Sequence, residues 1–285
     1  MDQIKEITKC EVCDNTTLVE GINLGLHPLC DDLIKIDESR VNKEYPIHIL
    51  FCEKCFTAHQ KYQVPKQQLF PSDYHYRARF TKDVLSGMKQ LVDDIESKFG
   101  SLQGKNVMDI GCNDGSLLDF FKLKGANTYG VEPTAASQDA SGKGHYIMNS
   151  YFAKPIAEVI SMNMRPDIIT FTNVFAHIED LNGVIENLKL IMKEDTILVI
   201  ENHYLGAVLE KNQFDTFYHE HPRTYSLNSF NFIAKKLNKD IIDFDFPSRY
   251  GGNIRVMMGN KEQAPEGHRT YLSYLDVNEK EINFG

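Results

Sequence analysis

The stretch 106–115 constrains the fold of this chain more than any other segment. An apolar run over 106–110 leads into two glycines, Gly111 and Gly115, and then into a helix-forming sequence from Ser116. This order of buried strand, glycine turn and helix is typical of a nucleotide-binding crossover. Because glycine has no Cβ atom, the backbone can bend tightly there and a ligand can approach it closely.

The spacing of the two glycines distinguishes between classes of nucleotide site. The segment lacks the G-x-G-x-x-G that seats a dinucleotide pyrophosphate, and it lacks the Lys and Ser/Thr of a phosphate-binding P-loop. What remains is D-x-G-x-x-x-G, a pattern associated with S-adenosylmethionine (SAM) sites. Many strand-turn-helix units carry two glycines, so the pattern needs support from elsewhere in the chain. The candidate SAM-binding residues of the turn are Asp109, Gly111, Asn113, Asp114 and Gly115.

Beyond this turn the chain alternates between apolar strands and helical segments. This alternation predicts an α/β fold with a mostly parallel, doubly wound sheet. We expect a Rossmann-like sheet domain, with the candidate SAM site, to occupy 71–285, with a linking helix at about 80–99. The remaining elements are predicted as strands over 128–132, 145–148, 167–173, 196–201 and 240–246, a helix over 226–237, and a last strand after Gly251-Gly252.

An acidic residue at the end of the second strand supports the SAM interpretation. Glu132 lies about twenty residues beyond the glycine turn, where a carboxylate usually holds a ribose diol. Ligands of such sheets bind outside the carboxyl ends of the strands, so Gly111, Glu132, Asn173 and Glu201 should share one rim. Pro133 and Asn173 therefore join Glu132 as cofactor-binding candidates.

Four of the six cysteines form two C-x-x-C pairs, Cys10/Cys13 and Cys52/Cys55. Four thiolates suit a closed tetrahedral Zn²⁺ site, which is structural because no coordination position is left open for chemistry. Disulfides and a redox C-x-x-C are the alternatives. A reducing cytosol counts against the first, and the lack of a helix opening directly after a strand counts against the second. We therefore expect a small zinc-binding module with a substrate loop over 1–70.

Two polar clusters follow the fourth and fifth predicted strands, where the topology would bring them to the same rim. His177 is a candidate base or substrate ligand, and the alternative is a loop histidine with its own hydrogen bonds. Tyr218, His219, Glu220 and His221 follow one another in the second cluster. A metal site is one interpretation, because His-x-His can ligate. The short spacing matches no standard metal signature, which favours acid–base chemistry with Glu220 supporting an imidazole.

The segment ahead of the predicted linking helix pairs two phenols with two guanidinium groups. Tyr74, Tyr76, Arg77 and Arg79 fall within six residues. Tyrosine hydroxyls and arginines at this spacing suit an anionic ligand such as a phosphorylated metabolite. The alternative is a surface turn with solvated arginines.

The charge balance and the absence of targeting segments limit the partners. A net charge of −9 argues against a general nucleic-acid or anionic-membrane binder. The N-terminus has no apolar h-region, and no apolar run is long enough to span a bilayer. We therefore expect a cytoplasmic protein that acts on a small molecule, with neither nucleic acid nor membrane as a partner.

Taken together, these segments resemble bacterial SAM-dependent sugar C-methyltransferases with an N-terminal zinc-binding domain, typified by the 3-C-methyltransferases of deoxysugar biosynthesis. The matches are collinear from Cys10 to about Met258, and the specific ones are N-x-x-A-H-I from Asn173 and Y-H-E-H from Tyr218. The other matching motifs are the paired C-x-x-C, Pro28-Leu29, Tyr74-x-Tyr76, D-I-G-x-N-D-G from Asp109, G-V-E-P from Gly130, and Gly251-Gly252.

The resemblance implies structural zinc in the first segment and SAM on the sheet domain. It also implies a sugar surrounded by His177, Tyr218, Glu220, His221 and an N-terminal tyrosine, with His221 removing a proton next to a keto group. The catalytic candidates are accordingly His221, Glu220, Tyr218, His177 and Tyr76, and the substrate-binding candidates are Tyr74, Arg77, Arg79 and His219.

Two departures from the family pattern concern the methyl acceptor. Family members carry Ser-Ser soon after the tyrosine pair, where this chain has Arg77-Ala78-Arg79, and they continue into a second α/β domain, where this chain ends at Gly285. We expect C- or O-methylation of a sugar, nucleotide sugar or phosphorylated precursor of a capsule-like polysaccharide or secondary metabolite, by a monomer or weak homo-oligomer. The alternative is a non-catalytic SAM- and zinc-binding partner protein.

Overall fold

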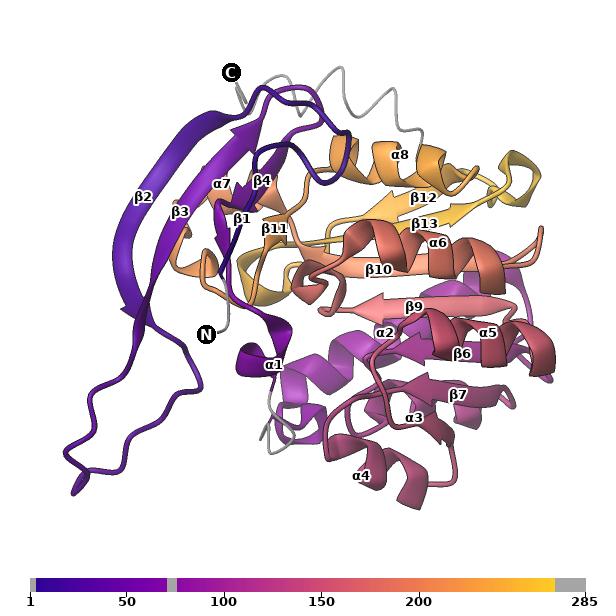
Figure 1. Cartoon of the computed structure of the whole chain (residues 1–285). Helices are drawn as coiled ribbons and strands as arrows, with labels where there is room; N and C mark the ends of the chain where they lie inside the picture. Colours follow the sequence, from indigo (N-terminus) through magenta and orange to yellow (C-terminus); the bar gives the residue numbers. More distant parts are fainter. Residues whose placement is uncertain (1–3, 71–75, 270–285) are drawn as a thin grey trace.

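A seven-stranded sheet forms the centre of the computed structural model, which describes residues 4–70 and 76–269 (Figure 1). The strand order is β12-β13-β10-β9-β6-β7-β8, and only β13 runs antiparallel to its neighbours. The predicted Rossmann-like sheet is confirmed. Its strands are β6 (Asn106–Ile110), β7 (Asn127–Val131), β8 (Tyr146–Met148), β9 (Ile168–Thr172), β10 (Ile197–His203), β12 (Asp240–Asp245) and β13 (Asn253–Gly259).

Helices cover both faces of this sheet. One apolar cluster packs α2 and α3 on the sheet, and a second packs α5, α6 and α8 on it. Val84, Leu91 and Ile95 recur at helical spacing and are buried, which explains why the predicted linking helix forms. The helices are α1 (Lys66–Leu69), α2 (Lys82–Phe99), α3 (Ser116–Leu123), α4 (Ala136–Gly142), α5 (Lys154–Asn163), α6 (Leu181–Ile191), α7 (Leu205–Glu210) and α8 (Leu227–Lys236).

Short 3-10 turns connect several of these elements and carry residues discussed below. They are η1 (Ala78–Phe80), η2 (Phe175–His177), η3 (Phe214–Thr216), η4 (Arg249–Gly251) and η5 (Lys261–Gln263).

The N-terminal region forms a smaller, four-stranded antiparallel sheet of order β11-β4-β3-β2 beside α7 and α8 (Figure 1). Its strands are β2 (Val19–Pro28), β3 (Glu44–Cys52), β4 (Thr57–Gln60) and β11 (Arg223–Thr224), and β1 (Lys5–Glu6) pairs separately with β5 (Tyr62–Gln63). Strand β11 lies in the chain between β10 and β12 of the main sheet, and its Arg223 forms an ion pair with Glu11 of the N-terminal region. Cys10, Cys52 and Cys55 belong to the same apolar cluster as the main sheet. The N-terminal region and the main sheet therefore share an apolar core.

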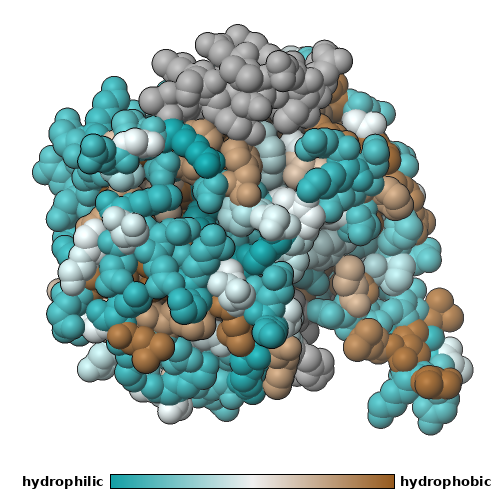
Figure 2. Space-filling model, turned by 180° about the vertical axis from the view of Figure 1, so that it is seen from behind, coloured by the Kyte–Doolittle hydropathy of each residue, from teal (hydrophilic) through white to brown (hydrophobic). Residues whose placement is uncertain are grey.

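The loop between β2 and β3 projects from the body of the molecule (Figure 1). It carries three strongly exposed apolar side chains, Leu33, Ile36 and Val41, and brown apolar atoms mark the projection at the lower right of Figure 2. None of the three belongs to an apolar core cluster of the described residues.

Strand β10 extends two residues beyond its predicted end, and this changes which residue lies at the rim. Glu201 is interior to the strand, fully buried, and ion-paired with Arg249 and Arg255. The expectation that Glu201 belongs to the rim is therefore wrong, and His203 ends the strand instead. The described helices include none with the length and apolarity that crossing a membrane requires.

Candidate active site

A cavity of about 590 Å³ opens at the carboxyl ends of β6, β7, β9 and β10. Gly111, Glu132, Asn173 and His203 follow or end these four strands, and all four line it. The volume lies within the range of about 300–1,000 Å³ typical of small-molecule sites. Eleven sequence-predicted site residues line the cavity: Tyr76, Asp109, Gly111, Asn113, Glu132, Pro133, Asn173, His177, Tyr218, Glu220 and His221.

The glycine turn is required by both backbone conformation and packing. Gly111 and Gly115 each have φ of 74°, in the left-handed region. A Cβ atom on Gly111 would lie 2.6 Å from Cγ2 of Val174, and one on Gly115 would lie 2.8 Å from Cδ2 of His145. Gly115 does not line the cavity, so its role is to let the turn before α3 pack closely against His145 and against Ala140 of α4.

Glu132 is held in a fixed orientation by the turn beside it. Its carboxylate accepts hydrogen bonds from the backbone N–H of Asn113 at 3.0 Å, from that of Thr134 at 2.8 Å and from the Thr134 hydroxyl at 2.6 Å. Oε1 accepts both bonds from Thr134, so only Oε2, which accepts from Asn113, retains a further lone pair. A carboxylate fixed at the cavity wall with this free position fits a hydroxyl group of a ribose.

The two aspartates of the motif have different surroundings. Asp109 lines the cavity, accepts a hydrogen bond from the Thr170 hydroxyl at 2.7 Å, and has its pKa raised to about 7 by burial. Asp114 is fully buried away from the cavity, where it accepts from the Ser116 hydroxyl at 2.6 Å and the Arg79 backbone N–H at 3.0 Å. Asp114 therefore shapes the turn and does not contact a ligand of the cavity.

At the other end of the cavity, Tyr218 and His221 form a hydrogen-bonded pair. Nδ1 of His221 lies 3.0 Å from the carbonyl oxygen of Thr216, which can only accept, so this nitrogen carries the proton. Nε2 is then an acceptor, and the Tyr218 hydroxyl donates to it over 3.1 Å. Burial lowers the pKa of His221 well below its ordinary value. The imidazole is thus neutral, with its lone pair directed at a phenol.

His177 and Glu220 lie next to this pair. Nδ1 of His177 donates to the backbone carbonyl of Glu220 at 2.8 Å, and the His177 ring centroid is 4.8 Å from that of His221. Burial lowers the pKa of His177 to about 4. Burial, and then the Asp31 carboxylate, raise the pKa of Glu220 to about 7. A carboxyl group that titrates near neutrality suits general acid–base work.

Three predicted substrate ligands lie outside this wall. His219 is buried, with Nε2 3.0 Å from the Tyr45 carbonyl, because residue 219 faces the N-terminal sheet while its neighbours face the cavity. Arg77 contacts Asp139 at 2.8 Å, and Arg79 contacts the same carboxylate at 3.0 Å. The predicted anion site at these arginines is therefore not formed, since a carboxylate occupies both guanidinium groups. Tyr74 lies outside the described residues.

Several lining residues were missed from the sequence. His203 lies two residues beyond the predicted end of its strand at Glu201. Tyr250 precedes a glycine turn for which the sequence suggests no ligand role, and both residues line the cavity. Lys66 lines the cavity 4.6 Å from the centroid of the Tyr151 ring, and its Nζ is 4.0 Å from a Glu179 carboxylate oxygen. Neither Lys66 nor Tyr151 belongs to a recognisable motif.

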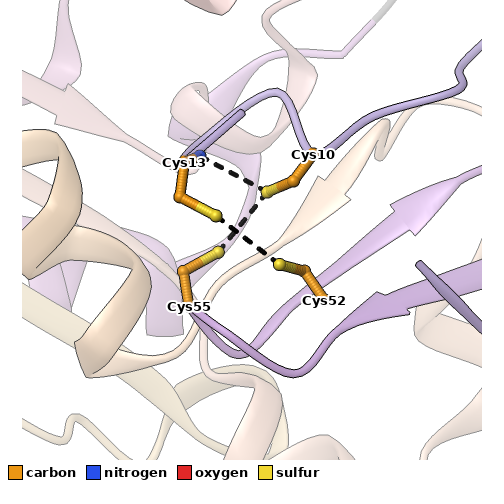
Figure 3. A group of neighbouring side chains, drawn as sticks. All are labelled: Cys10, Cys13, Cys52 and Cys55. Atoms are coloured by element: carbon orange, nitrogen blue, oxygen red, sulfur yellow. Dashed lines mark hydrogen bonds between the residues drawn. The ribbon is translucent and has the colours of Figure 1, made fainter. Parts of the chain in front are cut away.

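The four predicted cysteine ligands converge on one point in the N-terminal region (Figure 3). Their Sγ atoms lie within 4.8 Å of one another, with Cys10–Cys55 at 3.4 Å and Cys13–Cys52 at 3.6 Å. A tetrahedral Zn²⁺ with Zn–S bonds of about 2.3 Å has S–S edges of about 3.8 Å. The four thiolates therefore fit a closed, structural zinc site.

Comparisons with known proteins find family matches for both the main sheet domain and the N-terminal region. Residues 80–243 match the family described as "Methyltransferase domain", and residues 10–70 match the one described as "Putative zinc binding domain". The C-methyltransferase NovU of Streptomyces niveus is 26% identical over 259 residues, which are 90% of this chain and 61% of that protein. The chain thus spans about three fifths of this relative.

Other relatives match the sheet domain alone. The ubiquinone biosynthesis O-methyltransferase of Actinobacillus pleuropneumoniae is 27% identical over 115 residues, covering 38% of this chain and 49% of that protein. The PH0226 protein of Pyrococcus horikoshii OT3 superimposes with a TM-score of 0.50 at 11% identity, covering 68% of this chain and 98% of that one. This last similarity shows the fold only.

Proposed function

Because the chain belongs to the methyltransferase-domain family, we propose that it transfers a methyl group from SAM to carbon or oxygen of a sugar or nucleotide sugar. One observation carries this proposal. A single cavity has a fixed carboxylate and glycine turn at one end, and a phenol, imidazoles and a carboxyl group at the other. The similarity to a C-methyltransferase and the resemblance to sugar-modifying enzymes support the carbohydrate acceptor.

At the donor end, the strand ends of β6 and β7 provide the groups that would hold SAM. Glu132 would accept from a ribose hydroxyl, and the Gly111 backbone, which lines the cavity, would lie beside the bound ligand. Asn173 has φ of 54°, which asparagine tolerates, and its side-chain oxygen accepts from Asn253 at 3.2 Å. Bound SAM supplies an electrophilic methyl group on a sulfonium.

At the acceptor end, the Tyr218–His221 pair is positioned to handle the proton that the acceptor loses. Tyr218 presents its phenol oxygen to the cavity while its proton points at Nε2 of His221. If the phenol takes the acceptor's proton, its own proton can pass to the imidazole, whose Nδ1–H remains bonded to Thr216. The pair then acts as one base, with His221 as the final proton acceptor.

The remaining cavity groups would orient the acceptor. His177 and Glu220 lie on the wall beside the proton-accepting pair, and Tyr76 lies on the wall near the glycine turn, where its carbonyl accepts from the Asn113 side chain. Holding donor methyl and acceptor atom in line supplies much of the rate of such transfers.

Production of S-adenosylhomocysteine tests the proposal. The protein is incubated with SAM and a panel of nucleoside diphosphate hexoses, their 4-keto derivatives and hexose phosphates, and product is measured against a no-acceptor blank. Acceptor-dependent product is expected, and mass analysis identifies the methylated atom. SAM binding with no product from any acceptor would favour a non-catalytic partner protein.

A further inference from the structure

His203 occupies a cavity position that neither the motifs nor the comparisons assign. It is the last residue of β10, the point at which the central strand ends at the cavity. Its ring centroid lies 5.4 Å from that of His221 and 5.5 Å from that of Tyr250. The ring is thus held between the proton-handling pair and a second tyrosine.

Among the described residues, three imidazoles line the cavity, and they differ in how many of their ring nitrogens hydrogen-bond to the protein itself. His221 uses both, one with Thr216 and one with Tyr218, and His177 uses Nδ1 with the Glu220 carbonyl. Within residues 4–70 and 76–269, neither ring nitrogen of His203 has a hydrogen-bond partner or contacts a charged side chain. Of these three imidazoles, His203 is therefore the one with both ring nitrogens available to a ligand of the cavity.

The electrostatic surroundings of His203 favour an uncharged group as its partner. Burial lowers the pKa of His203, and the Asp215 carboxylate only partly opposes this. The ring is consequently neutral near pH 7, with one N–H donor and one acceptor nitrogen. Such a ring can bind a hydroxyl or carbonyl oxygen, whereas a phosphate would be better served by a cation.

Tyr250 is held beside His203 by an unusual backbone. Its φ of 53° and ψ of 31° place it in the left-handed region, where a tyrosine is strained. Gly252 follows at φ of 141°, and a Cβ atom there would lie 2.5 Å from the Cβ of Ala207. The preceding Arg249 is anchored by its ion pair with the buried Glu201. The strain is therefore imposed by the surrounding core and presents the Tyr250 ring to the cavity.

We propose that His203 is an acceptor-binding residue: a ring nitrogen hydrogen-bonds an oxygen of an uncharged sugar ring that lies against Tyr250. The inference rests on the proposed function and assigns the part of the acceptor that this wall recognises. The sugar ring would lie in the cavity against both His203 and the adjacent Tyr218–His221 pair, so His203 orients the ring while the pair takes its proton. Any phosphate groups of the acceptor would lie elsewhere.

Two substitutions at position 203 and one control elsewhere separate binding from folding. His203→Phe keeps a planar ring but removes both polar nitrogens, His203→Gln keeps a donor and an acceptor, and His268→Phe makes the same change at an exposed position. With an acceptor from the panel, His203→Phe should raise the acceptor KM by about tenfold, the upper range for one net hydrogen bond. His203→Gln should recover most of this loss, and His268→Phe should match the wild type.

The affinity for S-adenosylhomocysteine must stay within twofold in every variant, which shows that the sheet is intact. An acceptor KM within twofold of wild type in His203→Phe would overturn the inference. If the wild type methylates no member of the panel, the proposed function fails separately. The inference is then decided by ¹⁵N signals of the His203 ring in protein saturated with S-adenosylhomocysteine: shifts on adding a panel hexose support it, and no shift with any member refutes it.

Discussion

The two ends of the cavity are built in different ways. The donor end comes from consecutive strand-turn units, in which Gly111, Asn113 and Glu132 lie within 22 residues of one another. The acceptor end combines η2, the end of β10, the 218–221 segment and η4, which are separated by up to about 75 residues. The N-terminal sheet supports it as well, since Gln60 donates to the Tyr218 carbonyl at 3.3 Å. Local sequence thus builds the donor end, and distant segments build the acceptor end.

The largest effect should follow from breaking the zinc site, because it holds the sheet that supports the acceptor end. Cys52→Ser removes one of the four thiolates, and structural zinc contributes about 10–16 kcal/mol in small zinc domains. We expect metal analysis to find one zinc per wild-type chain and none in the variant. The melting temperature should fall by at least ~10 °C. A metal-free variant with wild-type melting would refute the zinc site.

Removing the imidazole of His221 tests the acceptor end alone. His221→Ala leaves the Tyr218 phenol without its proton acceptor, so turnover should fall by about 10²- to 10⁴-fold, the usual range for a general base. The affinity for S-adenosylhomocysteine should stay unchanged in calorimetry, because the donor end is untouched. Turnover near the wild-type value would remove His221 from the proton transfer.

The matching change at the donor end is Glu132→Ala. It removes a carboxylate that would accept from a ribose hydroxyl, and a charged hydrogen bond contributes about 1.5–3 kcal/mol. We expect calorimetry to show SAM affinity reduced by about 10- to 100-fold, with the acceptor KM little changed. Glu186→Ala, on the exposed side of α6, is the control. Equal SAM affinity in Glu132→Ala and wild type would exclude the ribose role.

Melting temperatures measured over a pH series should reveal the raised pKa of Glu220, the buried carboxyl group of the acceptor end. Glu220 titrates near pH 7 in the folded protein and near 4.5 when unfolded. The folded state therefore holds more protons between these values, and stability is lost as the pH rises from about 4.5 to 7. The melting temperature of Glu220→Gln should fall less than that of wild type over this interval, by about 5 °C. Parallel curves for the two proteins would contradict a raised Glu220 pKa.

The smallest effect should come from replacing Arg77. This substitution tests whether Arg77 serves only in its ion pair with Asp139 or binds an anionic substrate, as the sequence suggests. The contact with Asp139 is partly exposed, so Arg77→Ala should cost at most about 1 kcal/mol of stability. The acceptor KM should stay within twofold, because the guanidinium does not line the cavity. A KM increase of tenfold or more would restore Arg77 as a substrate ligand.

Sequence patterns alone predicted the sheet, the cluster of four cysteines, and most of the residues that line the donor end of the cavity, although Asp114 and Gly115 do not line it. Those features depend on contacts between near neighbours: a strand, a positive-φ glycine and a helix start within ten residues, or two cysteines on one turn. Tyr218, Glu220 and His221 of the Y-H-E-H cluster also line the cavity, because strand order fixes where the segment after β10 must go.

Only the tertiary structure decided that Arg77 and Arg79 stay outside the acceptor wall and that His203 belongs to it. Arg77 and Arg79 pair with Asp139, which lies about sixty residues away, and no local pattern reports that partner. His203 reaches the cavity because β10 continues for two residues alongside β13, with which His203 pairs at Asn253. The physical reason is the distance along the sequence between the residues that interact. Backbone conformation and local spacing are encoded residue by residue, whereas the partners of long polar side chains depend on segments that meet only after folding.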